Sequence, residues 1–193
     1  GVPVHAVPNS LSGCDRQPSE PPRDFLDNRM EANSQTIEIP LLIVGSGPAA
    51  LVIAKVVSGR GLPSLVVGHQ ATDNAEPVVL DSESIEILEP HGVLSVLRPY
   101  ATAQDPFTIT PLAFENALKH HCVADMLVTV YDRMHIDEAD MSNGGLHGGL
   151  TDGNTTWGIY ADAFVDVSEF SVDLNTAVHQ AAAFGNELMS NIT

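Results

Sequence analysis

Gly45, Gly47 and Ala50 follow an apolar, β-branched run at the spacing G-x-G-x-x-A. Each residue type suits one step of dinucleotide binding. The first glycine permits a tight turn, the second lets the backbone approach a pyrophosphate, and the alanine keeps the next helix close to the strand. The free N–H groups at the positive end of that helix would bind the anion. The pattern predicts a dinucleotide-binding turn whose cofactor contacts are Gly45, Ser46, Gly47, Pro48, Ala49 and Ala50.

The residues on either side of this turn predict a strand, a helix and a second strand in βαβ order. Residues 37–44 are apolar and β-branched, as expected of a buried strand. Pro48 suits the first turn of a helix, which we expect to continue to Gly61 as its C′ residue. Residues 64–67 form the second strand, at the short distance that a parallel crossover allows.

A transmembrane helix is the competing interpretation of the same stretch. Residues 41–57 are largely apolar and contain one charge, Lys55. Two glycines and a proline interrupt the run, and its length is at the short end of the roughly 17–25 residues that a membrane span needs. The composition therefore favours the βαβ unit.

Charge and cysteine content exclude several classes of function. The chain of 193 residues has a net charge of −17 and only 8 Lys and Arg residues. Nucleic acids and anionic membrane surfaces both require a basic footprint, so neither is expected as a partner. The two cysteines, Cys14 and Cys122, make no disulfide framework and no C-x-x-C pair. An acidic face of this kind either meets a basic protein partner or simply keeps the protein soluble.

The first 36 residues differ in composition from the rest of the chain. They are rich in proline and polar residues and have no sustained period of 2 or 3.6. We expect residues 1–36 to form an extended Pro-rich arm that is a disordered tail when free and is ordered only if a partner subunit holds it in place. Residues 37–193 are expected to form a single Rossmann-like α/β domain.

Downstream of the βαβ unit, the pattern predicts two helices. The first covers residues 81–88 and is closed by Pro90 and Gly92. The second begins at Thr110 as N-cap with Pro111 at the first helical position. Its expected buried face consists of Leu112, Ala113, Leu118 and Val123.

The remaining residues predict strands and a final helix. Residues 127–131 and 163–167 are expected to be separate strands. Between them, the turn sequences Asn143-Gly144-Gly145 and Asp152-Gly153 predict a small antiparallel meander over residues 134–160. Residues 173–192 carry apolar side chains at helical spacing and predict the last helix.

This order of elements resembles a known superfamily. The segments LLIVGSGPAA, FTITPLAFENALKHHC and LTDGNTTWGIYADAFVDVSEFS occur in the order found in the FAD-binding portion of flavoprotein hydroxylases. The similarity is closer to plant-type and algal lycopene cyclases. The resemblance implies a Rossmann-like FAD/NAD(P)-binding fold with a parallel sheet and a β-meander, and FAD as the cofactor, its pyrophosphate facing residues 45–50.

Three departures from the family pattern argue against a working flavin site. The family has an acidic residue at the end of the second strand, where this chain has Gly68 and His69, and Asp73 is the nearest downstream substitute. The family has a small residue and a glycine where this chain has Ser168 and Glu169. The later G-D motif and the substrate domain that the resemblance implies do not follow in this sequence.

Two main hypotheses for function result. The first is a non-catalytic accessory or scaffold subunit of a larger complex, built on a degenerate FAD-binding fold. For such a subunit, descent from lycopene cyclases implies a plastid photosynthetic complex, with the protein soluble or peripheral to the membrane. The alternative is an FAD- or NAD(P)-dependent oxidoreductase or a lycopene-cyclase-like carotenoid-modifying enzyme. A simple nucleotide-binding module is a third option.

Other clusters of reactive residues predict neither a metal site nor a catalytic residue. His120, His121 and Cys122 are adjacent, and adjacent helical residues point about 100° apart. The acidic stretch that follows His135 is interpreted as a solvated loop. Asp162 and Asp166 share a strand face without the base that acid/base chemistry needs.

Overall fold

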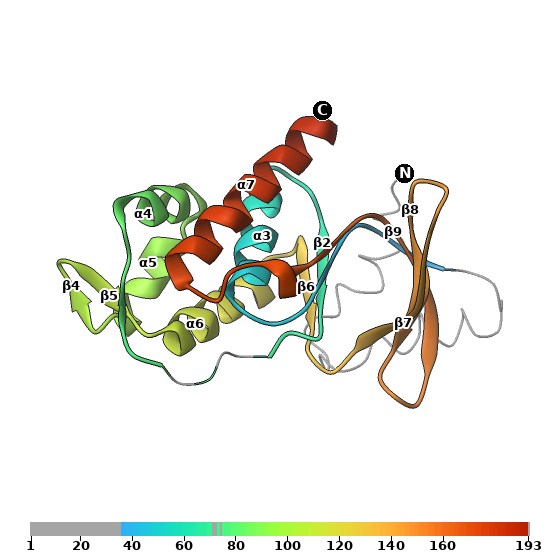
Figure 1. The fold of residues 1–193 in the computed structure, drawn as a ribbon, viewed down its shortest axis with the longest axis horizontal. Helices are drawn as coiled ribbons and strands as arrows, with labels where there is room; N and C mark the ends of the chain where they lie inside the picture. Colours follow the sequence, from blue (N-terminus) through green and yellow to red (C-terminus); the bar gives the residue numbers. More distant parts are fainter. Residues whose placement is uncertain (1–35, 71–72, 74, 193) are drawn as a thin grey trace.

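A six-stranded sheet runs through the part of the protein that the computed structural model describes, residues 36–70, 73 and 75–192. Its strand order is β6-β2-β1-β9-β8-β7 (Figure 1). The first four are parallel to one another and the last three are antiparallel. The bounds are β1 Ile37–Val44, β2 Ser64–Val67, β6 Val128–Tyr131, β7 His135–Ser142, β8 Gly145–Thr151 and β9 Thr156–Asp166.

The predicted βαβ unit is confirmed. β1 and β2 pair in parallel, and α3, Pro48–Ser58, connects them. The apolar run over residues 41–57 is thus divided between a strand and a helix instead of forming one membrane span. The helix ends before Gly61: Gly59 follows it in a right-handed conformation, and Gly61 takes a φ of +88° in the turn beyond. Within the described residues, no helix has both the length and the apolarity needed to cross a bilayer.

The third strand of the meander continues into the parallel sheet. Residues 163–167 were expected to form a separate strand, and this prediction is wrong, because β9 runs without interruption over Thr156–Asp166. It pairs antiparallel with β8 through Ala161 and parallel with β1 from Ile159 to Asp166. The sequence between the two halves contains no proline or glycine that would break the strand. The meander itself and both of its turns are confirmed.

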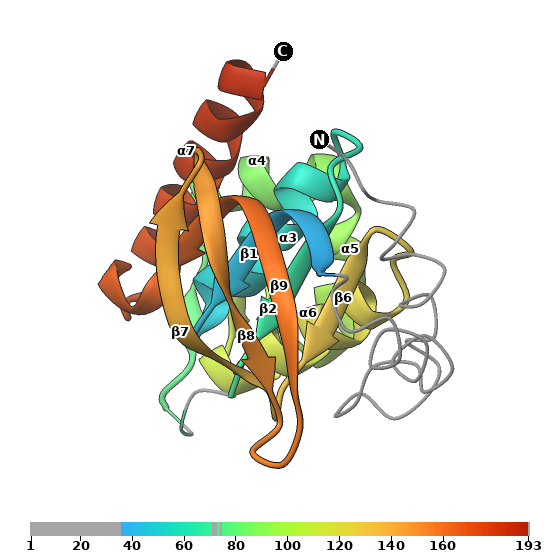
Figure 2. The same cartoon turned by 90° about the vertical axis from the view of Figure 1, so that its right-hand side faces the viewer.

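Two hydrophobic cores lie on opposite faces of the parallel strands. The helices α3, α6 (Pro111–Val123) and α7 (Leu174–Ile192) cover one face and form the first core with α4 (Ser82–Leu88) and α5 (Val93–Leu97). The meander covers the other face and forms the second core, which includes Trp157 (Figure 2). β1 contributes residues to both cores, Leu41 and Ile43 to the first and Ile39 and Leu42 to the second.

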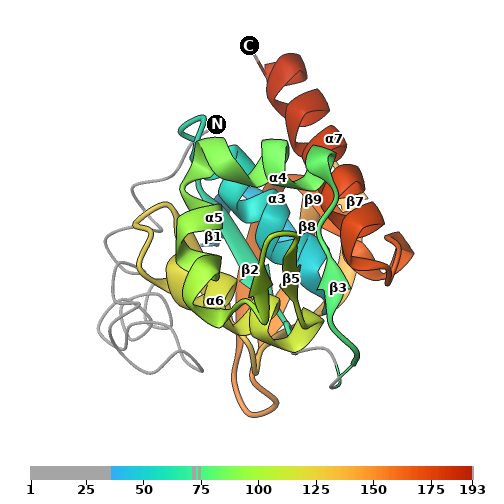
Figure 3. The same ribbon diagram turned by 90° about the vertical axis from the view of Figure 1, so that its left-hand side faces the viewer.

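A small second sheet was not predicted. Its order is β3-β5-β4, with β3 at Val78–Val79, β4 at Ala103–Gln104 and β5 at Phe107–Ile109. Figure 3 views the end of the molecule that carries this sheet together with α4 and α5. Strands of two or three residues are too short to show a period in the sequence, and the five residues of α5 give the same difficulty.

The helix boundaries agree closely with the prediction, but the buried face of α6 does not. Thr110 is the N-cap of α6, and its side chain accepts a hydrogen bond from the N–H of Ala113. The fully buried apolar residues follow i, i+4 spacing at Phe114, Leu118 and Cys122, whereas Val123 is 39% exposed. Leu112 and Ala113 are only partly buried. The other two helices predicted after the βαβ unit also begin where expected. Asp81 is the N-cap of α4. The last helix, α7, begins at Leu174.

The predicted arm lies outside the described residues, apart from Thr36. The division into an arm of residues 1–36 and a single domain of residues 37–193 therefore stays a prediction.

Candidate dinucleotide-binding site

The carboxyl ends of the four parallel strands meet at one edge of the sheet. Gly45 follows β1, Gly68 follows β2, Asp132 follows β6 and Val167 follows β9. The backbone holds these ends together, since Gly45 N–H donates to Val67 O over 3.2 Å and Gly68 N–H donates to Tyr131 O over 3.0 Å. Ligands of open α/β sheets bind at this edge, so the predicted cofactor turn occupies the expected position.

The two glycines of the turn have different roles. Gly45 has a φ of +121°, and a Cβ atom there would lie 2.9 Å from Cγ2 of Val167. The first glycine is therefore required for packing between the turn and the segment after β9. Gly47 has a φ of +103°, and a Cβ atom there would meet nothing within 4 Å. The space beyond the second glycine is open to a ligand, as the spacing predicts.

The first turn of α3 provides donors without a competing acceptor. Gly47 is the N-cap residue and contributes no side-chain hydrogen bond, and the first turn contains no acidic residue. Orphan N–H groups at such a helix start bind anions, and the helix dipole adds to the attraction. Pro48, Ala49 and Ala50 have buried side chains, and Ala50 is completely buried in the first core. Only the backbone of these three residues is therefore suited to contact a phosphate.

Ser46 ties the glycine turn to the end of β2. Its exposed hydroxyl accepts a hydrogen bond from the N–H of Gln70 over 3.2 Å and donates to Gly68 O over 3.5 Å. Ser46 thus positions the segment after β2 beside the turn, a role that sequence reasoning did not assign to it.

His69 is buried at the place where the flavoprotein resemblance requires a ribose-binding carboxylate. Its side chain is 1% exposed, and its Nε2 atom lies 3.2 Å from Oε1 of Glu115, whose side chain is 0% exposed. Glu115 comes from α6, where a charged residue within a helix is ordinarily interpreted as solvent-facing. Sequence reasoning missed this pair for that reason. Asp73, the substitute considered from the sequence, is exposed.

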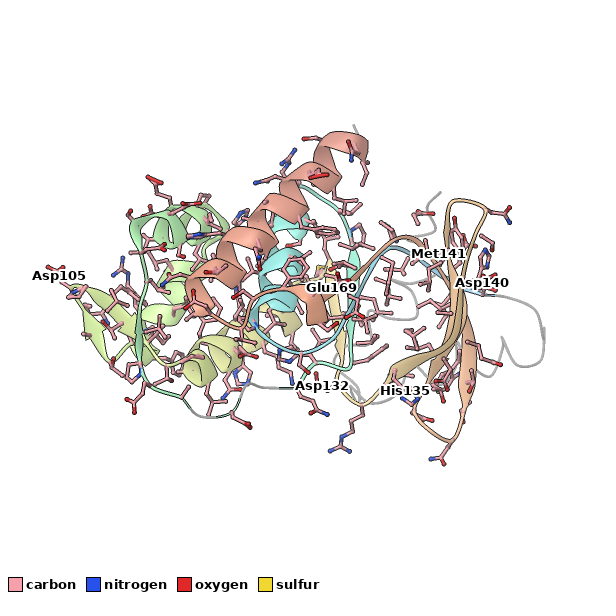
Figure 4. All side chains as sticks on the ribbon, in the orientation of Figure 1. Asp105, Asp132, His135, Asp140, Met141 and Glu169 are labelled. Carbon is pink, nitrogen blue, oxygen red and sulfur yellow. The ribbon has the colours of Figure 1, made fainter. Side chains whose placement is uncertain are left out.

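Negative charges lie close to the same edge of the sheet. Ser168 and Glu169 form a short 3-10 helix with Val167, and both are exposed. Figure 4 labels Glu169 and Asp132. Asp166 accepts a hydrogen bond from the N–H of Ser168 over 2.9 Å. Asp132 is held by an ion pair with Lys119. Because the carboxylate of Glu169 is exposed, water can solvate it. Its charge would oppose phosphate binding only where the phosphate displaced that water.

A partly buried ion pair at the opposite end of α3 was also missed. Lys55 Nζ lies 2.7 Å from Asp125 Oδ2, and the Ser58 hydroxyl donates to the same oxygen over 2.8 Å. Burial opposes ionisation of Asp125, but the hydrogen bonds from Lys55, the Leu127 N–H and Ser58 outweigh it and lower the pKa of the carboxyl. This network joins α3 to the start of β6.

The remaining clusters do not form a site. His120 is exposed, while Cys122 is buried and points to Leu51 O; burial raises the pKa of the Cys122 thiol to about 12. His135 and Asp137 are both exposed, 3.6 Å apart, on β7. Asp162 and Asp166 are exposed on β9. Across the described residues, no three metal-ligating side chains are grouped so as to hold an ion.

Solved structures of flavoproteins share this fold. The rebeccamycin biosynthetic enzyme RebC with reduced flavin superposes with a TM-score of 0.56 at 16% identity, covering 68% of this chain and 33% of that one. The p-nitrophenol 4-monooxygenase PnpA from Pseudomonas putida superposes with a TM-score of 0.56 at 15% identity, covering 67% of this chain and 40% of that one. Anhydrotetracycline hydroxylase OxyS from Streptomyces rimosus has a TM-score of 0.55 at 13% identity, and the superposition covers 67% of this chain and 31% of that one. The chain thus spans about a third of the length of these proteins.

A search of curated protein sequences gave no significant match. The neighbouring structures support a hydroxylase-like flavoprotein fold, whereas the closer similarity to lycopene cyclases has no support among them. The family described as "FAD binding domain" matches residues 38–155, which include the glycine turn, α6 and most of the meander. On that match, the chain belongs to the FAD-binding domain family.

Proposed function

We propose that this chain is the FAD-binding portion of a flavin-dependent oxidoreductase. The observation that carries the proposal is the open space beyond Gly47 at the uncapped start of α3. At the G-x-G-x-x-A spacing and at the start of a helix, a glycine with a positive φ and open surroundings is best explained by a ligand that approaches the backbone there. The family match over residues 38–155 supports FAD as that ligand.

The residues present fit a pyrophosphate. The backbone of Ser46 and Gly47 and the N–H groups of Ala49 and Ala50 would hold it, and Ser46 keeps the end of β2 beside it. When bound, FAD supplies the ability to accept electrons from one substrate and pass them to another. The chain spans about a third of its structural neighbours, so substrate binding and the complete reaction belong to the proposal.

A matched pair of glycine variants tests this assignment. In Gly47→Ala the new methyl group occupies the open space and the positive φ costs about 1–3 kcal/mol, so FAD affinity measured by calorimetry should fall by at least about tenfold. Gly61→Ala is the control, because its φ of +88° and open surroundings impose the same strain at the other end of α3. Equal FAD affinity for both variants, or no FAD binding to the unaltered protein, would contradict the proposal.

A non-catalytic accessory subunit is the second candidate. The observation that favours it is the buried contact between His69 and Glu115, because neither group is exposed to accept hydrogen bonds from a ribose at the end of β2. Under this hypothesis the arm of residues 1–36 contacts other subunits, and the fold persists without its cofactor. An absorbance spectrum of protein purified from its native source separates the candidates: stoichiometric flavin excludes the second one.

A lycopene-cyclase-like activity and a plastid setting are finer forms of these proposals. They rest on the order of segments in the sequence. Conversion of a linear carotene by the flavin-loaded protein would support the first, and localisation of the native protein to plastids by cell fractionation would support the second.

A further inference from the structure

The turn after β6 lies against the end of β2. The two strands pair in parallel to their last residues, and the Gly68 N–H donates to Tyr131 O over 3.0 Å. The Met134 N–H donates to the same carbonyl over 3.4 Å, which closes the turn. A Cβ atom on Gly68 would lie 3.5 Å from Met134 O. The two turn residues, Asp132 and Arg133, are therefore held beside the end of β2.

Arg133 carries the unpaired positive charge of this turn, and its side chain is exposed. Within residues 36–70, 73 and 75–192, its guanidinium makes no hydrogen bond or ion pair, whereas each other Lys or Arg there has a partner. The partnered cations are Lys55, Arg60, Arg98 and Lys119. The Arg133 guanidinium is thus available to an anion that reaches the end of β2.

The end of β2 itself presents no exposed carboxylate over residues 68–70. Gly68 has no side chain, and His69 is buried against Glu115. Gln70 is exposed and ends in an uncharged amide. Its backbone N–H donates to Ser46 Oγ over 3.2 Å, which keeps it beside the glycine turn. An anion at this place therefore meets an amide and a guanidinium instead of a like charge.

The residue types at the end of the second strand determine which adenosine ribose a dinucleotide site accepts. An acidic residue accepts hydrogen bonds from the free ribose hydroxyls, whereas a nearby arginine accommodates a phosphate on the ribose. A guanidinium presents its N–H donors in a planar fork that matches two phosphate oxygens. With a net charge of −17, the overall field of this chain repels anions, so phosphate binding depends on such a local cation.

We propose that Arg133 makes the adenosine end of the dinucleotide site selective for a nucleotide whose ribose carries a phosphate. The guanidinium pairs with that phosphate, and the Gln70 amide donates a hydrogen bond to it from the end of β2. The inference rests on the proposed function, because the ligand uses the same glycine turn. FAD has free hydroxyls on this ribose, so the inference adds a second class of ligand that competes with FAD.

Calorimetry on the full chain tests the preference with three nucleotides: NAD⁺, NADP⁺ with its 2′-phosphate, and the 3′-phosphate isomer of NADP⁺. We expect a phosphate form to bind at least about tenfold more tightly than NAD⁺, and the difference to shrink as salt increases. The tighter isomer identifies the hydroxyl that carries the phosphate, and it should displace bound FAD.

The outcomes separate this inference from the proposed function. Equal affinity for the three nucleotides in a protein that binds FAD would overturn the inference alone, and so would a phosphate form that binds without displacing FAD. Selective binding of a phosphate form without FAD binding would support the inference and contradict the proposed function. Failure of FAD and of all three nucleotides to bind at about 1 mM would overturn both.

A pair of charge-removing variants locates the selectivity. Arg133→Met should lower the ratio of phosphate-form affinity to NAD⁺ affinity by at least about tenfold. Arg133→Lys keeps the charge without the planar fork and should retain part of the ratio. Arg60→Met removes the same charge from the turn after α3 and should leave the ratio unchanged. An equal loss in both Met variants would refute the role of Arg133, since net charge alone would then explain the preference.

Discussion

At the scale of single residues, the two glycines of the turn differ in what surrounds them, and only Gly47 has the open space that the proposed cofactor needs. Gly45 cannot carry a side chain because Val167 occupies the space, whereas Gly47 faces no protein atom within 4 Å. Both glycines fit the same sequence motif, yet only the second indicates a ligand. His69 stands at the end of β2, where the flavoprotein pattern has an acidic residue. Its side chain is buried against Glu115 and contributes to the fold.

Asp125 should make the stability of the protein depend on pH in acid. Its pKa is lowered in the folded state, so its contribution is present above the unfolded pKa of about 3.9 and is lost as the pH falls through the lower folded value. Asp125→Asn leaves Lys55 without its ion-pair partner and should reduce the free energy of unfolding by about 2 kcal/mol near neutral pH.

Urea unfolding at several pH values checks this prediction. The difference in the free energy of unfolding between Asp125→Asn and the unaltered protein should stay constant down to about pH 5 and shrink below about pH 4. Glu86→Gln removes an exposed carboxylate from α4 and should change the stability little at any pH. A difference that is independent of pH would rule out the ionised pair as the cause.

At the scale of secondary-structure elements, the helix layer depends on close contact between α3 and α7. Gly185 of α7 is buried, and a Cβ atom there would lie 2.8 Å from Cγ1 and 3.3 Å from Cβ of Val56. A β-branched valine in a helix has little rotamer freedom with which to move away. The final helix therefore requires a small residue at this position for packing.

Gly185→Ala provides a test in which two effects have opposite signs. Helix propensity alone predicts a gain of about 1 kcal/mol. Steric overlap with Val56 predicts a loss of about 1–3 kcal/mol, and we expect a net decrease in the free energy of unfolding. In the Val56→Ala background the overlap disappears, so Gly185→Ala should become neutral or stabilising. The same effect in both backgrounds would disprove the contact.

At the scale of the whole molecule, β1 and β9 belong to both hydrophobic cores. β1 has side chains in the core under the helices and in the core under the meander, and β9 pairs with both β1 and β8. Neither core can lose its strands without exposing apolar surface of the other. The described part of the chain should therefore unfold as one cooperative unit.

The single tryptophan makes this prediction measurable. Trp157 lies in the second core, whereas far-ultraviolet circular dichroism is dominated by the helices of the first. Both signals should follow the same urea transition with the same midpoint. A fluorescence transition that precedes the loss of helical signal would show that the meander unfolds separately.

Short-range signals in the sequence account for the part of the fold that was predicted correctly. Strand β1, the glycine turn, the start of α3, the Thr110 cap and the meander turns all depend on residues within a few positions of one another. Their periodicity and backbone preferences are therefore present in the local sequence. The family match also agrees with the flavoprotein resemblance that these segments suggested.

Contacts between distant segments account for the part that was not predicted. The continuity of β9 depends on its pairing with β1, and the burial of His69 depends on Glu115, 46 positions away in the numbering. Among the described residues, β8 pairs with β9 only as far as Ala161, whereas β1 pairs with it as far as Asp166. Such features follow from which surfaces pack together, and the free energy of that packing is shared among many residues rather than encoded in a local pattern.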